Sequence, residues 1–247
     1  MITAALGTAD CERVGSGHLA QPVNALSSLA FCVVGLWIVA RAFRAERGRR
    51  AELGVFGAAV FANGVGSFAL HGPQPGWSRW AHDAAIVAVL LFAGVHALTS
   101  LAGWPVRDRL ALFVAILAFA VTTIAATPDA SYAWFVVAGI VGGAGEVAAV
   151  RAGYRPWPIR GRDARTLAWL LAVSAFAVGA VAFFLGRSDS PVCDPGTLLQ
   201  GHGLWHVLQA LAMGGYAFAA IELWSGPDEM TSREGGGEGV SSATGRT

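Results

Sequence analysis

The sequence predicts an all-α integral membrane protein with seven transmembrane helices, and three observations carry this prediction. Of the 247 residues, 55% are hydrophobic and only 13% are charged, a balance typical of membrane proteins rather than of soluble domains. Seven apolar runs follow one another along the chain. Arginines collect on alternate connections between these runs, as expected when the chain crosses a membrane repeatedly.

Each apolar run is close to the length of about 17 to 25 residues that a helix needs to cross the hydrocarbon. None alternates apolar with polar residues as the strands of a membrane β-barrel do. In chain order the runs cover about Pro22 to Ala40, Leu53 to Leu70, Ala84 to Leu101, Leu110 to Ala126, Tyr132 to Val150, Leu167 to Leu185 and Leu204 to Leu223.

The remaining residues define two flanking segments. Residues 1–21 carry Asp10 and Glu12 but no basic cluster, so the first run is expected to be a retained helix and not a signal peptide. We therefore expect an outer N-terminal segment over 1–21 and a single seven-helix domain over 22–224. The tail 225–247 is rich in Gly, Ser, Thr and Glu and is expected to be disordered and cytoplasmic.

The placement of arginine predicts the orientation. All seventeen basic residues are arginine, and the connections after the first, third and fifth runs hold twelve of them, whereas the opposite side holds three. The twelve are Arg41, Arg44, Arg47, Arg49, Arg50, Arg107, Arg109, Arg151, Arg155, Arg160, Arg162 and Arg165, and the three are Arg13, Arg79 and Arg187. This bias predicts a multi-pass cell-membrane protein with its N-terminus outside and its C-terminus in the cytoplasm. The formal net charge of +1 argues against a nucleic-acid partner.

Polar residues gather where three runs meet the predicted outer surface. His202 and His206 open the last run at i, i+4 spacing, which puts both imidazoles on one helix face. Ser67 and His71 repeat that spacing at the end of the second run, and Asp83 opens the third. The predicted topology places all five at a similar depth, which predicts a single site.

Three imidazoles that leave a fourth position open are typical of catalytic zinc sites. Such a zinc ion lowers the pKa of its bound water to about 7 and polarises a carbonyl group. The sequence thus predicts His71, His202 and His206 as ligands. Asp83 is the expected general base, and Ser67 is expected to contact the developing oxyanion, although Ser67 could instead bond its own helix backbone.

Other polar residues have simpler interpretations. His82 competes with Asp83 for a role, but adjacent helix residues point about 100° apart, and Asp83 is preferred. His18 and His96 are expected to be packing or interfacial residues. Glu146 is expected to snorkel or to pair with Arg151, and Glu222 to lie at the interface.

The chain has three cysteines. Cys11 and Cys193 both fall on the predicted outer side close to the membrane, where a disulfide is plausible and two free thiols are the alternative. Cys32 lies within the first run and is expected to be packed.

Taken in order, these motifs resemble the alkaline ceramidase family, within the wider group of seven-helix membrane hydrolases that includes the adiponectin receptors. The resemblance extends from residue 11 to about residue 224. Its matching pieces are Cys11-Glu12, Asn24 with Ser27, Gly66-Ser67 through His71, Asp83, Asp189 with Cys193, and His202 with His206.

The resemblance implies a zinc amidase that cleaves the fatty-acyl amide of ceramides into sphingoid base and fatty acid. It implies that His71, His202 and His206 bind zinc, that Asp83 is the acid/base group, and that Ser67 contacts the substrate. Cys11 and Cys193 match a pair that is disulfide-linked in the family. The family's calcium site is matched only by Glu12 and a displaced Asp10, which make a poor calcium cage. The arginine-only, alanine-rich composition indicates a GC-rich bacterial genome.

Two other functions fit the same residues. The zinc site would equally serve an ester hydrolase acting on a phospholipid or another acyl lipid. Alternatively, the chain is a receptor-like membrane protein in which the zinc is structural. Loss of lipid turnover on replacement of Asp83 would distinguish an enzyme from such a receptor.

Overall fold

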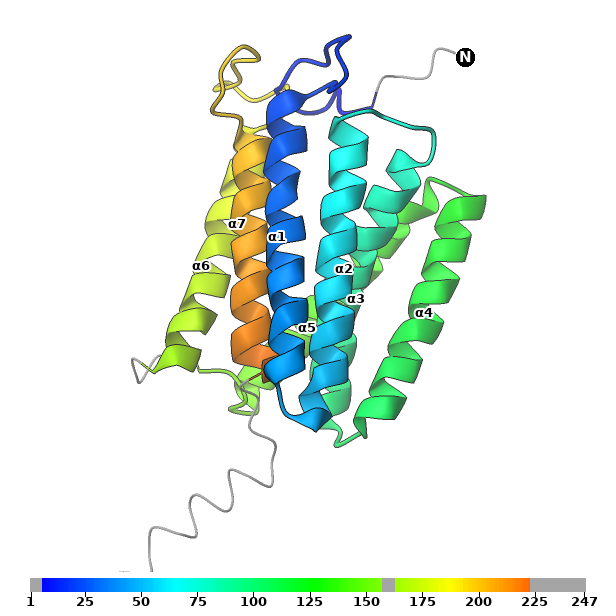
Figure 1. The fold of residues 1–247 in the computed structure, drawn as a ribbon, viewed down its shortest axis with the longest axis vertical. Helices are drawn as coiled ribbons and strands as arrows, with labels where there is room; N and C mark the ends of the chain where they lie inside the picture. Colours follow the sequence, from blue (N-terminus) through cyan, green and yellow to red (C-terminus); the bar gives the residue numbers. More distant parts are fainter. Residues whose placement is uncertain (1–5, 157–162, 223–247) are drawn as a thin grey trace, which may run out of the picture.

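The computed structural model is all-helical over the residues it describes, 6–156 and 163–222, and forms a bundle of long, roughly aligned helices (Figure 1). The elements are α1 (Pro22–Arg44), α2 (Arg47–His71), α3 (Ser78–Leu101), α4 (Val106–Ala126), α5 (Ala130–Arg151), α6 (Ala164–Leu185), α7 (Gly201–Tyr216) and the π-helical turn η1 (Ala217–Glu222). Among these residues seven helices are long and apolar enough to cross a membrane, α7 counting together with η1.

The seven-helix prediction is therefore confirmed, with helices somewhat longer than the apolar runs. Polar residues extend several helices, because backbone hydrogen bonds continue into the connections until a proline, a glycine or a cap ends them. Pro22 begins α1, and the Asp163 carboxylate caps α6 by accepting a hydrogen bond from the Thr166 backbone N–H at 2.9 Å. The predicted tail 225–247 lies outside the described residues.

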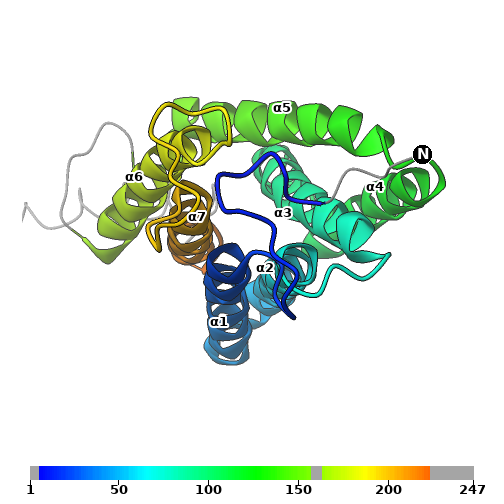
Figure 2. The same ribbon diagram turned by 90° about the horizontal axis from the view of Figure 1, so that it is seen from above.

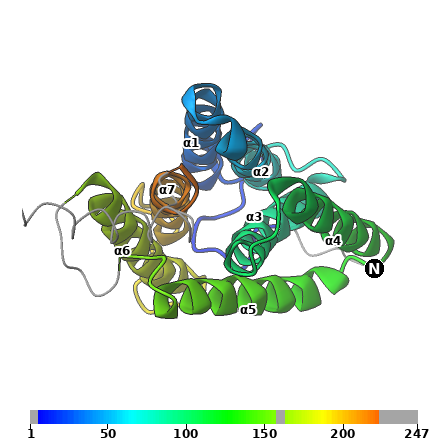
Figure 3. The same cartoon turned by 90° about the horizontal axis from the view of Figure 1, so that it is seen from below.

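The centre of the bundle is α3, which packs against α2, α4 and α5. α1 packs on α2 and α7, and α6 packs on α7. Seen from the two ends of the bundle, α5 is visible along its length, so it is inclined to the other helices and crosses behind α3 (Figures 2 and 3). Large apolar side chains on α4, α5 and α6 point outward, as expected for helices that face lipid.

Glycines let the central helices approach closely. A Cβ on Gly35 of α1 would lie 2.5 Å from the Phe61 nitrogen of α2, and one on Gly94 of α3 would lie 2.6 Å from the Val141 carbonyl carbon of α5. Small residues at such crossings are the usual basis of helix packing in lipid, where burial of apolar area between helices gives little driving force.

The bundle has two polar ends, which we name by their residues. The histidine end holds the C-terminus of α2 and the N-termini of α3 and α7, together with the segment before α1. The arginine end holds the C-termini of α1, α3 and α5, the N-termini of α2, α4 and α6, and the connections between them, and those of the twelve arginines counted above that the structure describes lie here. The direction in which the two ends face across a membrane remains a prediction.

Ion pairs at the arginine end differ in part from those expected. Glu146 is held by Arg155 through two hydrogen bonds of 2.8 and 2.9 Å, so the expected pairing with Arg151 is wrong. The chain turns at Gly153, whose φ of +78° favours glycine, and Arg155 then enters the bundle. Glu222 pairs with Arg41, and His96 is a buried residue whose Nδ1 lies 3.1 Å from a Glu52 carboxylate oxygen.

Candidate metal centre

Three histidines meet at the histidine end of the bundle. His71 is the last residue of α2, and His202 and His206 occupy the first two turns of α7. All three are buried, and one nitrogen from each lies within 4.8 Å of the others. The ring centroids are 4.6 Å apart for His202 and His206, 4.9 Å for His71 and His202, and 5.3 Å for His71 and His206. Within the described part of the chain, this is the one group of at least three His, Cys, Asp or Glu residues arranged to hold a metal ion.

Close backbone contacts bring α7 to this position. A Cβ on Gly186, which ends α6, would lie 2.3 Å from the His202 backbone nitrogen, and a Cβ on Gly201 would lie 2.6 Å from the Ala182 carbonyl oxygen. No side chain fits between the end of α6 and the start of α7. The glycine pair therefore fixes where the two α7 histidines enter the site.

One nitrogen of each imidazole, Nδ1, faces a polar group of the protein. The Nδ1 of His71 lies 2.7 Å from the Gln21 side-chain oxygen. The Nδ1 of His202 lies 3.0 Å from Asp10 Oδ1, within ion-pair distance but without the geometry of a hydrogen bond. The Nδ1 of His206 lies 3.1 Å from the Asn24 carbonyl oxygen. Carbonyl and carboxylate oxygens accept hydrogen bonds, so they favour the tautomer that carries its proton on Nδ1.

The opposite nitrogens, Nε2, are the atoms left for a ligand. The Nε2 atoms of His71 and His202 are buried without a hydrogen-bond partner, and the Nε2 of His206 has only the Ser67 hydroxyl at 3.2 Å. A buried nitrogen lone pair without a partner is costly. Two such nitrogens and the Nε2 of His206, each on a ring whose other nitrogen faces a protein oxygen, fit the donor set of a zinc site with an open fourth position.

Ser67 lies beside this group, one turn before His71 on α2. Its hydroxyl oxygen is 2.9 Å from that of Ser28 on α1, as well as 3.2 Å from the Nε2 of His206. Ser67 is thus directed at the candidate site and at another helix, and no hydrogen bond to its own helix is found among the described residues.

Asp83 lies on α3 next to His82 and outside the ligand group. Its Oδ1 accepts a hydrogen bond of 2.9 Å from His82 Nδ1, and its Oδ2 is 3.8 Å from Arg79 Nε. The neighbouring His82 ring stands edge-on to His71, with 6.3 Å between centroids. A Cβ on Gly66 would lie 2.8 Å from the His82 backbone nitrogen, so α2 and α3 touch at this point.

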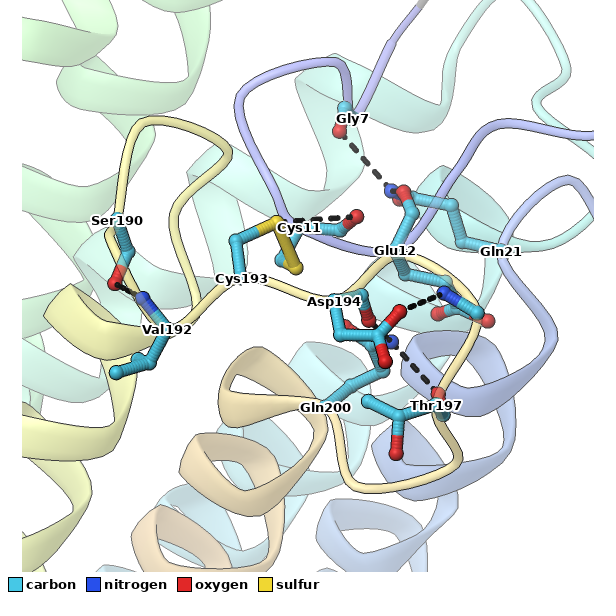
Figure 4. Close-up of a disulfide and its surroundings, with 11 residues drawn as sticks. Gly7, Cys11, Glu12, Gln21, Ser190, Val192, Cys193, Asp194, Thr197 and Gln200 are labelled. Carbon is cyan, nitrogen blue, oxygen red and sulfur yellow. Dashed lines mark hydrogen bonds between the residues drawn. A yellow bond between two sulfur atoms is a disulfide. The ribbon is translucent and has the colours of Figure 1, made fainter.

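The segment before α1 covers the histidine end, as seen from above in Figure 2. A disulfide joins Cys11 of this segment to Cys193 of the α6–α7 loop (Figure 4), so the pair that was left open between a bond and two thiols is bonded. The free Cys32 is partly buried in α1.

The two acidic residues considered for calcium point to different partners. The carboxylate oxygens of Glu12 accept hydrogen bonds of 2.7 and 2.8 Å from the backbone N–H groups of Val23 and Asn24, and so cap the first turn of α1. Asp10 instead faces His202 and His71. Burial disfavours the charged form of Asp10, but His202, His71 and Arg187 outweigh this effect and hold the pKa of the carboxyl below its ordinary value.

Some residues of the site were not singled out for it by the sequence. Gln21 accepts from His71 and also donates to the Gly7 and Glu12 carbonyl oxygens at 3.0 and 2.7 Å, linking the N-terminal segment to the ligand group. The Asn24 side-chain amide is buried without a hydrogen-bond partner beside α7. Both flank the start of a helix that begins at the histidine end, and Asn24 is also one of the residues that carry the family resemblance.

Comparison with known proteins identifies one relationship. The family model described as Ceramidase matches residues 11–233, which include every residue of the candidate site except Asp10. No curated protein matches the chain.

Proposed function

The chain belongs to the ceramidase family, and from that premise we propose that it is an intramembrane zinc-dependent hydrolase of a lipid amide bond. The proposed substrate is ceramide-like and yields a sphingoid base and a fatty acid. The observation that carries the metal part of this proposal is the convergence of three buried imidazoles whose Nε2 atoms lack a protein partner or have only a serine hydroxyl.

We assign the ligands to His71, His202 and His206. Zinc held by three imidazoles supplies Lewis acidity toward a carbonyl group and a water of lowered pKa. The donor set supports zinc over calcium or magnesium, because those ions prefer oxygen ligands. A membrane lipid is the expected partner, since the site lies among helices that are apolar enough to span a bilayer.

The remaining side chains divide the chemistry. Asp83 takes a proton from the attacking water and returns it to the amide nitrogen as the carbon–nitrogen bond breaks, so that a neutral amine leaves and the acyl group becomes a carboxylic acid. Ser67 donates a hydrogen bond to the carbonyl oxygen as negative charge develops on it. Its contacts with Ser28 and His206 support this role, because they hold the hydroxyl at the ligand group.

We also propose that the histidine end faces outward, with the C-terminus in the cytoplasm and the protein in the cell membrane. The arginine count supports this orientation. The disulfide between Cys11 and Cys193 supports it independently, because disulfides persist in oxidising compartments outside the cytosol.

Metal analysis of the purified protein, together with a lipid assay, tests the proposal. We expect one zinc per chain in the wild type and none in the double variant His202→Ala, His206→Ala. The wild type should release free sphingoid base and fatty acid from ceramide in detergent, and the double variant should not.

Other results would redirect the proposal. Release of lysolipid from a phospholipid, with ceramide intact, would make the protein an ester hydrolase on the same site. Stoichiometric zinc without turnover of any acyl lipid would favour a receptor-like protein with a structural metal. Wild type that holds no metal after reconstitution with zinc would contradict the metal assignment.

A further inference from the structure

Asp10 is a buried carboxylate that does not come from any transmembrane helix. It lies in the segment before α1, with only 9% of its surface exposed. Its Oδ1 is 3.0 Å from the Nδ1 of His202, and its Oδ2 is 3.9 Å from the Nδ1 of His71. One side chain thus stands behind two of the three histidines.

The backbone around Asp10 is fixed on both sides. The residue forms an isolated antiparallel bridge with Arg187, where the Ser188 N–H donates to the Ala9 carbonyl oxygen at 3.0 Å and the Cys11 N–H donates to Gly186 at 2.8 Å. Asp10 is therefore anchored to the short segment that follows α6, directly beside the glycine contact that fixes the start of α7.

The disulfide adds a covalent tie at the next residue. Cys11 is bonded to Cys193 in the loop that leads into α7 (Figure 4). Residues 9–12 are therefore tied to the α6–α7 segment by both the bridge and the disulfide, which hold the Asp10 backbone beside the start of α7.

From these contacts we propose that Asp10 is a positioning residue of the metal centre, which holds the His202 ring so that its Nε2 points at the other two histidines. The proposal rests on the metal site proposed above and adds a residue that orients one of its ligands. A carboxylate behind a ligating imidazole fixes its tautomer and orientation and raises its basicity as a ligand. The disulfide is the tie that keeps this carboxylate in place.

The test compares zinc affinity in Asp10→Ala, Asp10→Asn and a control, Asp189→Asn. Asp189 is an exposed acidic residue of the same loop region, so its replacement changes the charge equally and leaves the metal site untouched. By competition with a chelator, we expect Asp10→Ala to bind zinc about 10- to 100-fold more weakly than wild type. Asp10→Asn keeps one acceptor oxygen, so its zinc affinity should fall between those of Asp10→Ala and wild type. The zinc affinity of Asp189→Asn should match that of wild type.

A spectroscopic readout separates positioning from general damage. With Co²⁺ in place of zinc, the visible absorption bands report the geometry of the ligands. We expect the bands to shift in Asp10→Ala and Asp10→Asn, while melting temperatures without metal show that both variants fold. Bands and affinities identical to wild type in both variants would overturn the proposal.

Reduction of the disulfide tests the tie. A reductant should lower the zinc affinity of wild type and have little further effect on Asp10→Ala, because the tie acts through the missing carboxylate. An equal loss in both proteins would show that the disulfide acts independently of Asp10. A wild type that binds no zinc would instead refute the proposed function itself, so the two failures are distinguishable.

Discussion

The histidine end and the arginine end both bury polar groups, but they satisfy them differently. At the arginine end, charged groups pair with one another. At the histidine end, the Nδ1 atoms of the three imidazoles face protein oxygens, whereas their Nε2 atoms have no partner or a single serine. Burying a polar atom without a hydrogen-bond partner costs free energy. Binding of a ligand to these nitrogens would offset that free energy at the histidine end.

The Arg155 cluster shows what full pairing looks like. The guanidinium donates twice to Glu146 and stacks over the rings of Trp169 and Tyr216, and the Tyr216 hydroxyl donates to the same carboxylate at 3.0 Å. These residues join α5, α6 and α7 with the connection after α5. The cluster has no free donor set for a metal and is suited to holding helices together.

Three further side chains at this end lie against backbone carbonyls of η1, the turn that continues α7. Arg165 donates to the Ala219 carbonyl oxygen at 3.1 Å, and Arg49 donates to that of Glu222 at 2.8 Å. His96 Nε2 lies 3.2 Å from the Ala220 carbonyl oxygen. Arginine side chains at a helix C-terminus satisfy its last carbonyls and interact favourably with the negative end of the helix dipole. The two ends of this helix therefore differ, since the N-terminus of α7 bears two of the proposed ligands and its continuation η1 is anchored by side chains of other helices.

The largest effect expected at the histidine end is a loss of catalytic activity on replacement of Asp83. Asp83→Asn should lower kcat/KM for the lipid amide by about 10²- to 10⁴-fold, the usual contribution of a general acid/base group. Zinc content and melting temperature should stay near wild type, because Asp83 is outside the ligand group. Steady-state kinetics with metal analysis on the same samples measure all three quantities.

His82→Gln provides the matched variant for that experiment. Glutamine keeps a donor toward Asp83, so we expect a smaller loss than for Asp83→Asn. A larger loss in His82→Gln, with zinc retained, would move the acid/base role to His82, whose ring is 6.3 Å from that of His71. Loss of zinc from His82→Gln would add His82 to the ligand set.

At the arginine end the predicted effect is on stability. Arg155→Met removes a buried guanidinium and leaves the partly buried Glu146 carboxylate without its cation, so it should lower the free energy of unfolding by about 3 kcal/mol. Zinc content per folded chain should be unchanged. Denaturant titration in mixed micelles, followed by metal analysis of the folded fraction, tests both expectations.

Two controls identify the cause. Arg151→Met removes a nearby arginine that is exposed and should change stability by less than about 0.5 kcal/mol. Adding Glu146→Gln to Arg155→Met should recover part of the loss, because the unpaired charge is then gone. Should Arg155→Met instead lose zinc at unchanged stability, the division of roles between the two ends would be wrong.

Much of the site was predictable because helices convert spacing into direction. The pairs Ser67 and His71, and His202 and His206, had to share helix faces, and the seven-helix topology had to bring those faces to one end. Helical spacing could not predict that Asp10 and Gln21 lie against the imidazoles of His202 and His71. The segment before α1 has no helical period, and its path is set by a disulfide and a bridge to residues more than 170 positions away along the chain.

The partner of Glu146 was missed for a related reason. Helical proximity favoured Arg151, on the same helix, whereas the structure uses Arg155 after a turn at Gly153. Sequence patterns describe what a regular helix presents, and they do not describe where the chain goes after the helix ends. Buried partners supplied by connections must therefore be found from the fold.

The smallest predicted effect concerns the glycine contact at the start of α7. Gly186→Ala places a methyl group 2.3 Å from the His202 backbone nitrogen, so α6 and α7 must separate. Overpacking of this kind costs about 1–3 kcal/mol, and the shift acts on a helix that carries two of the proposed ligands. We expect a lower melting temperature and weaker zinc binding together.

Gly139→Ala is the matched control, because a Cβ at Gly139 of α5 has nothing within 4 Å. There the same substitution should change stability by less than about 1 kcal/mol, in either direction, with zinc affinity unchanged. If Gly186→Ala lowers stability and leaves zinc affinity at the wild-type value, the ligand geometry is set by the Nδ1 partners alone. If both fall together, the backbone contact between α6 and α7 is itself part of what distinguishes the histidine end from the arginine end.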